Sequence, residues 1–237
     1  MRARVFLILI FALSLNAAWP RNFRAQQPVA AQKSSVDLGG FVKEVMIFKM
    51  EDGRSQLVMW LPYEFFAAAS LMQTGKTAAA VDEEIGFLKP YITMAVQNST
   101  ERPDGGSAYL NESEVRARAV LKLADGSEIR PLTVVPPKVS ATLSALKTLI
   151  SAEGDAGSAN MHILVFPKNT TRGTPIVETT KKDALTLVLK SHGKFKETSF
   201  NWRTPFDAAT NVPDCPRCKA AMSSKWSYCP YDGQKLP

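Results

Sequence analysis

Hydrophobic and polar positions alternate at the start of the chain's long middle region, residues 41–203. Phe41 to Lys49 spaces its apolar residues in a way that favours a strand, and Gln56 to Leu61 is a second such run. Between them lies Glu51-Asp52-Gly53-Arg54, and Asp-Gly is a strong short-range signal for a tight hairpin turn. We therefore predict an antiparallel hairpin here.

Three stretches instead repeat apolar residues every three or four positions, which is typical of helices with one buried face. The first of them follows Pro62, and proline suits the first position of a helix. The pattern predicts helices at Tyr63–Gln73, Lys76–Lys89 and Lys138–Ala152.

The remaining apolar runs are short and strand-like. Val115–Leu123 alternates apolar with basic residues, as an antiparallel strand with one exposed face does. Because strands outnumber helices and are mostly joined by turns, we expect an α+β central domain, residues 41–203, with a largely antiparallel sheet. The predicted strands are Tyr91–Val96, Val115–Leu123, Glu128–Val135, Met161–Phe166 and the hairpin of Leu185–Lys190 with Lys194–Arg203.

The net charge of the 237-residue chain is +7, and the excess lies at its two ends. Residues 1–35 contain five basic residues and no acidic one, and residues 212–237 contain four basic and two acidic ones. Residues 36–211 therefore sum to zero. The overall charge gives no reason to expect nucleic-acid binding by the central domain.

The N-terminus has the order of an export signal. Arg2 and Arg4 precede an uncharged apolar run at residues 5–15, and small residues follow. We predict that residues 1–18 form a signal peptide, cleaved after Ala18 or Ala31. An uncleaved inner-membrane anchor at residues 5–18 and a buried N-terminal helix are the alternatives. The expected location is the bacterial periplasm or cell envelope. Residues 19–40, rich in Pro, Gln, Ser and Gly, are expected to be a linker.

All three cysteines lie near the C-terminus, in Cys215-Pro-Arg-Cys218 and Cys229-Pro-Tyr-Asp232, with ten residues between the two segments. Each segment places two metal-ligating residues at the spacing of zinc sites. Three cysteines cannot all pair in disulfides, whereas one metal ion can engage all of them. We predict zinc bound by Cys215, Cys218, Cys229 and Asp232 in a small lobe at residues 213–237, joined to the central domain by a linker at residues 204–212.

These two segments resemble the zinc-ribbon family, specifically the compact CPxC…CPxC ribbons at the termini of many bacterial proteins. The resemblance covers about residues 213–236. It implies a small metal-stabilised hairpin and no particular activity, because such ribbons are attached to many unrelated domains. Asp232 stands where the family pattern has its fourth cysteine. A carboxylate can bind zinc, but it is a harder ligand than a thiolate, so we expect a weaker, more exchangeable site.

Three other interpretations of the cysteines stay open. The site can be completed by water or by His192 instead of Asp232, or the ribbon can be degenerate and bind no metal. Alternatively, Cys215 and Cys218 form a redox pair, with Cys229 as the resolving thiol. Redox pairs of the thioredoxin type open a helix in a βαβ unit, whereas Cys215 follows a linker, and this disfavours the third interpretation.

No stretch of the sequence resembles a catalytic centre, and we expect His162 to pack on a strand face with Leu164 and Phe166. Basic and aromatic residues occur together at residues 181–203 and in the C-terminal segment. Such mixtures bind nucleic acid or anionic lipid, but they also arise where a solvated face covers core aromatics. Export favours an anionic membrane surface over nucleic acid.

We therefore expect a non-enzymatic, exported or membrane-tethered protein that binds a protein partner or acts as a scaffold, with a structural zinc ribbon. A thiol-redox or hydrolytic enzyme of the cell envelope is the first alternative. A nucleic-acid-binding protein is the second, if the chain is not exported.

Overall fold

The computed structural model describes residues 38–74, 76–153, 156–209, 214–220, 222–223 and 226–236. The predicted signal or anchor at residues 1–18 and the linker residues 19–37 and 210–212 lie outside the described residues, as do residues 213, 221, 224, 225 and 237 of the predicted C-terminal lobe. The helices are α2 (Leu38–Val45), α3 (Tyr63–Thr74), α4 (Ala78–Ile85), α5 (Glu112–Arg118), α6 (Pro137–Glu153) and α7 (Ala156–Ala159), with short 3-10 turns at η1 (Gly86–Leu88) and η2 (Asp207–Ala209). The strands are β1 (Met46–Glu51), β2 (Arg54–Leu61), β3 (Tyr91–Glu101), β4 (Ser107–Tyr109), β5 (Ala119–Lys122), β6 (Glu128–Ile129), β7 (His162–Pro167), β8 (Asp183–Leu189) and β9 (Thr198–Thr204).

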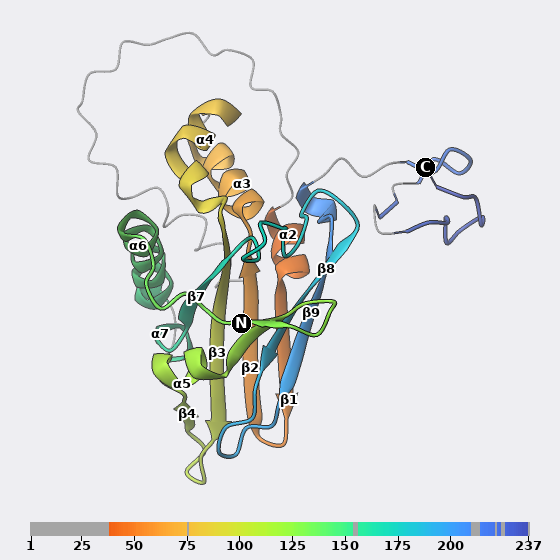
Figure 1. Ribbon diagram of the computed structural model, residues 1–237. Coiled ribbons are helices and arrows are strands. Elements are labelled where there is room, and N and C mark those ends of the chain that lie inside the picture. Colours follow the sequence, from red (N-terminus) through yellow and green to blue (C-terminus); the bar gives the residue numbers. More distant parts are fainter. Residues whose placement is uncertain are drawn as a thin grey trace.

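These strands form two antiparallel sheets (Figure 1). The first sheet has the order β1-β2-β3-β4, and β7 also pairs with the long strand β3. The second has the order β6-β5-β8-β9. The prediction of an α+β domain with antiparallel strands is confirmed, while its division into two sheets was not predicted.

The hydrophobic core lies between the inner faces of the two sheets. Trp60 of β2 and Trp202 of β9 are both almost fully buried, and their rings meet edge to face with centroids 6.2 Å apart. Phe206, just beyond β9, packs against Trp60 with ring centroids 5.0 Å apart. Aromatic pairs in this arrangement add to the stability gained from area burial alone.

Helices α2 and α3 close one end of this core (Figure 1). Phe41 of α2 contacts Phe65 of α3 and Phe206, with ring centroids 5.6 and 5.2 Å apart. The Trp202 indole N–H donates to the Val45 carbonyl at 2.9 Å, which ties α2 to the second sheet. Among the described residues, no helix combines the length and the apolar character that crossing a bilayer requires.

The prediction of a strand from Phe41 was wrong as far as Val45, because these residues belong to α2. The buried residues of this segment are Leu38, Phe41, Val42 and Val45, which is helical spacing. Gly39 and Gly40 made the first turn look like linker sequence. The predicted strand is correct from Met46 onward, where β1 begins, and the turn to β2 lies at Asp52 and Gly53 as expected.

The prediction of a strand from Val115 was also wrong as far as Arg118, because Glu112–Arg118 is helix α5. Asn111 caps this helix: its side chain accepts a hydrogen bond from the Glu114 amide, and the Glu114 carboxylate accepts one from the Asn111 amide. This reciprocal capping box fixes a helix start. The alternation of Val115 with its neighbours is therefore coincidental, and the strand β5 begins at Ala119.

The other predicted elements are present with shifted ends. The predicted strand Glu128–Val135 is paired only at Glu128 and Ile129, and Pro131 follows, a residue that cannot donate to a strand ladder. The folded body also extends further than expected at both ends. Leu38 and Phe206, both assigned to linkers from the sequence, are buried in the core.

Candidate metal centre

Two turns of the same geometry build the site. In each turn, the cysteine amide donates a hydrogen bond to the carbonyl of the residue five positions later in the chain. The amide of the residue four positions later donates a hydrogen bond to the carbonyl of the same cysteine. The pairs are Cys215 N–Ala220 O at 2.9 Å, Lys219 N–Cys215 O at 3.0 Å, Cys229 N–Gln234 O at 2.8 Å and Gly233 N–Cys229 O at 2.9 Å. The fourth residue after each cysteine has a positive φ, 60° at Lys219 and 70° at Gly233. The two segments therefore fold as equivalent local units, with Asp232 in the position that corresponds to Cys218.

The turns bring the four residues predicted from the sequence into one group. One sulfur or carboxylate oxygen from each of Cys215, Cys218, Cys229 and Asp232 lies within 4.8 Å of every other, and the group can hold a metal ion. Cys218 Sγ lies 3.7 Å from Cys229 Sγ, and Cys215 Sγ lies 3.5 Å from the nearer carboxylate oxygen of Asp232. All three cysteines are free.

The two distances match the opposite edges of a tetrahedral coordination shell. Metal–sulfur bonds of about 2.3 Å place two tetrahedral sulfurs about 3.8 Å apart, and a metal–oxygen bond of about 2.1 Å places sulfur and oxygen about 3.6 Å apart. A disulfide would need its sulfurs about 2.0 Å apart. The donor set and its spacing therefore fit one tetrahedral metal ion.

The donor groups differ in how readily they ionise. The Gln234 amide donates to Asp232 Oδ1 at 2.9 Å, and with the hydrogen bond to Cys229 it lowers the pKa of Asp232. Burial raises the pKa of the Cys229 thiol to about 11, although backbone hydrogen bonds oppose the rise. Burial also acts to raise the pKa of Cys215, but hydrogen bonds from the backbone of Cys218 and Arg217 outweigh it, and that pKa is lowered. Because thiols bind metals as thiolates, metal binding here releases protons.

Few side chains other than the metal ligands are buried around the site. Among the described residues of the C-terminal lobe (214–220, 222–223 and 226–236), the buried cluster consists of two thiols and two apolar side chains, namely Cys215, Cys229, Met222 and Leu236. A set of this size is far smaller than the core of an independently stable domain, and protein segments of this length normally need a metal or disulfides to fold.

The structure bears on the alternatives that involve His192 and a redox pair. The group of four does not include His192, which lies in the β8–β9 turn with its Nε2 3.7 Å from a Glu114 carboxylate oxygen. Cys215 and Cys218 flank a turn rather than open a helix, so they lack the setting of a thioredoxin-type pair. His162 is buried, with Nε2 3.0 Å from the Leu110 carbonyl, as expected for a packed histidine.

Aromatic residues of the two basic stretches have opposite environments. In the central body, Phe200 and Trp202 are buried in the core, so the basic residues around them form a solvated face. In the C-terminal lobe, Trp226, Tyr228 and Tyr231 are 43%, 61% and 74% exposed.

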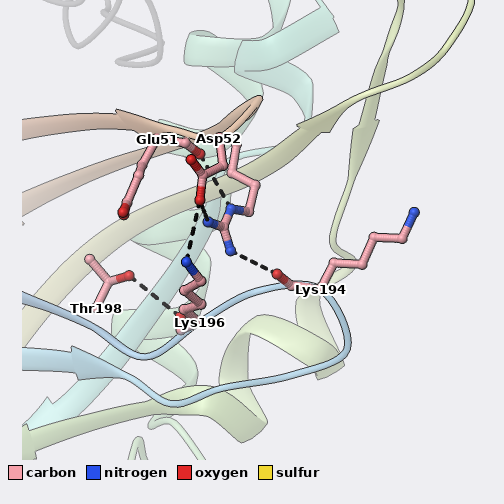
Figure 2. A network of polar contacts seen from close by, with 6 residues as sticks. Glu51, Asp52, Lys194, Lys196 and Thr198 are labelled. Carbon is pink, nitrogen blue, oxygen red and sulfur yellow. Dashed lines mark hydrogen bonds and ion pairs between the residues drawn. The ribbon is translucent and has the colours of Figure 1, made fainter.

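Sequence reasoning did not predict a cleft at the β1–β2 turn, whose polar contacts are drawn in Figure 2. Arg54 donates to the carbonyl of Lys194 at 2.8 Å and to the carboxylate of Asp52 at 2.7 Å. Asp52 also accepts from Lys196 at 3.3 Å. These contacts join the β1–β2 turn to the β8–β9 loop. No local sequence signal connects segments that lie about 140 residues apart, and the cleft becomes visible only in the folded chain.

Two buried polar side chains lie near this cleft. Arg118 packs over the ring of Phe195, which lines the cleft, at 4.8 Å, and its Nε donates to the Lys190 carbonyl. Asn98 is the strand partner of Gln56, another lining residue, and is fully buried. Among the lining residues, Lys49 and Arg54 each donate to a backbone carbonyl and Lys196 donates to Asp52. The volume of the cleft, about 30 Å³, has room for little more than a water molecule. The contacts around this cleft join the two sheets.

No protein-family model and no curated protein matches the chain. Among solved structures, the chain is similar to the crystal structure of a DUF4426 family protein from Pseudomonas aeruginosa PAO1, with 12% sequence identity and a TM-score of 0.31. The match covers 67% of this chain and 94% of that one. A likeness this weak decides neither the family nor the function of the chain.

Proposed function

We propose that this chain is an exported or membrane-tethered, non-enzymatic protein of the bacterial cell envelope, in which the α+β body binds a protein partner and the C-terminal lobe is stabilised by zinc. The observation that carries the zinc site is the group of four donor atoms, in which the Cys218–Cys229 and Cys215–Asp232 distances match two opposite edges of a tetrahedron. Zinc is the ion that this group fits best, since thiolates select soft or borderline metals and disfavour magnesium and calcium.

A structural role follows from the number of protein donors. Catalytic zinc sites keep one position open for water or substrate, whereas structural sites fill all four positions with protein ligands. Here Asp232 supplies the fourth donor, and its carboxylate lies 3.5 Å from Cys215 Sγ. A closed site leaves no position for substrate. The resemblance to zinc ribbons agrees with this role.

Metal and thiol analysis of the purified full chain tests the proposal. We expect one zinc per chain and three thiols that react slowly until a strong chelator is added. In Asp232→Asn we expect weaker zinc retention, because a neutral amide replaces the carboxylate ligand. Asp214→Asn is the matched control, because Asp214 is an exposed acid outside the group of four. A chain that contains a disulfide and no metal would contradict the proposal and favour a thiol-redox protein.

Export rests on the N-terminal sequence. Fusion of residues 1–35 to a reporter that is active only outside the cytoplasm tests it, and we expect an active reporter. The control fusion carries Leu9→Arg, which interrupts the apolar run that an export signal needs. If both fusions stay inactive, the protein is not exported, and nucleic-acid binding becomes the favoured function.

A further inference from the structure

The C-terminal lobe exposes an unusual concentration of large apolar side chains. Among the described residues, six such side chains are exposed, and three of them, Trp226, Tyr228 and Tyr231, lie within six consecutive positions. Of the other three, Phe48 and Met50 lie on β1, and Val134 lies in the segment between β6 and α6. Exposed aromatics concentrated in this way mark an interaction surface.

The exposed charged residues of the same lobe are mostly basic, and one of them is a strand neighbour of an exposed aromatic. Tyr228 is paired with Lys235 in an antiparallel bridge, so the two side chains are cross-strand neighbours on one face. Tyr231 and Arg217 occupy the same position in the two equivalent turns, and both are exposed. Three of the four exposed charged residues described in the lobe, Arg217, Lys219 and Lys235, are basic, and Asp214 is acidic.

We propose that Trp226, Tyr228 and Tyr231, with Arg217 and Lys235, form a docking face that lies on the anionic headgroups of a lipid membrane. Tryptophan and tyrosine favour the membrane–water interface because one end of each side chain is apolar and the other is polar. Basic side chains add attraction to anionic lipids. The inference rests on the proposed function, because an exported or tethered chain works next to a membrane.

The chain itself favours lipid over single-stranded nucleic acid, which mixed basic and aromatic surfaces also bind. Its sequence carries an apolar run of eleven residues at positions 5–15 after two arginines, and such a run delivers a chain to a membrane. The docking face depends on the folded lobe, because the two turns position Arg217 and Tyr231. Removal of the metal should therefore abolish docking.

The test follows the environment of Trp226 in the zinc-loaded full chain. Subtracting the fluorescence emission spectrum of Trp226→Phe from that of wild type leaves the contribution of the Trp226 indole. The emission of Trp60 and Trp202, which are buried, is removed by the subtraction. With vesicles of phosphatidylcholine and phosphatidylglycerol, we expect the difference spectrum to shift to the blue and to be quenched by brominated lipid. With phosphatidylcholine alone, the apparent affinity should be at least about tenfold weaker.

Charge variants supply the matched comparison. Arg217→Glu with Lys235→Glu should weaken the response to anionic vesicles at least about tenfold while zinc content stays at one per chain. Lys122→Glu, an exposed position on β5, makes the same type of charge change on the body and should leave the response unaltered.

Three results would overturn the proposal: no shift of Trp226 emission with anionic vesicles, an equal effect of Lys122→Glu, or a response to a single-stranded oligonucleotide and not to vesicles. Zinc content is measured on the same samples. A zinc-loaded chain without the Trp226 shift contradicts the docking face alone, and a zinc-free chain that still shows the shift contradicts the structural zinc site alone.

Discussion

The positive φ angles in the two metal-binding turns lead to a quantitative prediction. Gly233 has φ of 70°, and a Cβ added there would meet no atom within 4 Å. Gly233→Ala therefore introduces backbone strain without a steric clash. The left-handed region costs a residue with a Cβ about 1–2 kcal/mol relative to glycine.

This strain should appear as a loss of metal affinity. Because the lobe has little core of its own, its folding and metal binding are coupled, and about 1–2 kcal/mol corresponds to a roughly 5- to 30-fold weaker affinity. Lys219 occupies the equivalent position with φ of 60°. Lys219→Gly removes strain there, and since glycine also makes the unfolded chain more flexible, we expect a smaller gain of about two- to tenfold.

Competition between the full chain and a chromophoric zinc chelator measures both variants. Gly126→Ala is the matched control. Gly126 lies in the turn between β5 and β6, has φ of 83°, and also has open space around an added Cβ. The variant Gly126→Ala should lower the stability of the body and leave the affinity of the chain for zinc unchanged. If Gly233→Ala binds zinc as tightly as wild type, or Lys219→Gly binds more weakly, the two turns are not the strained and equivalent units described above.

Three further predictions concern the body and use urea denaturation. Burial lowers the pKa of His162, so below about pH 6.5 the unfolded chain takes up a proton that the folded chain does not; stability should fall as the pH drops below about 6.5, and His162→Gln should reduce this fall. Arg54→Ala should cost about 0.5–1.5 kcal/mol through the lost hydrogen bond to the exposed Lys194 carbonyl. Asp52→Asn should cost less, since that carboxylate is 63% exposed; a larger cost for Asp52→Asn would contradict this order. Trp202→Phe should cost about 1–3 kcal/mol through the lost indole hydrogen bond, and an unchanged midpoint would show that this bond contributes nothing.

Local sequence patterns predicted the metal site better than they predicted the body. Each of the two turns is complete within six residues, and the hydrogen bonds that shape it run between close neighbours. Cysteine spacing therefore contained nearly all of the information that brings Cys215, Cys218, Cys229 and Asp232 together.

The errors in the body have a common cause. Helices α2 and α5 have eight and seven residues, too few for a helical period to be distinguished from alternation. For α5, Asn111 and Glu114 did contain a usable signal, since Asn-x-x-Glu is the spacing of a capping box. For α2, including Leu38 with Phe41 would have completed the helical spacing of the buried residues.

Pairings between strands far apart in the sequence were beyond local reasoning, whereas the two hairpins β1–β2 and β8–β9 were predicted from their turns. Strand β5 pairs with β8, about seventy residues away, and β3 pairs with β7 across a similar distance. Hydrophobic alternation determines which face of a strand is buried, but it does not determine the neighbouring strand. The division into two sheets, and with it the cleft between the β1–β2 turn and the β8–β9 loop, depends on tertiary packing.

The exposure of the aromatic residues in the C-terminal lobe has a physical explanation in its metal-centred design. In the body, Trp60 and Trp202 are buried because the stability of that domain comes from apolar area removed from water. In the lobe, the two buried thiols lie where a core would be, beside only Met222 and Leu236, and a metal ion would supply the free energy that a larger core supplies elsewhere. The chain therefore does not need to bury Trp226, Tyr228 or Tyr231 to fold, and these side chains stay available for contact with a partner surface.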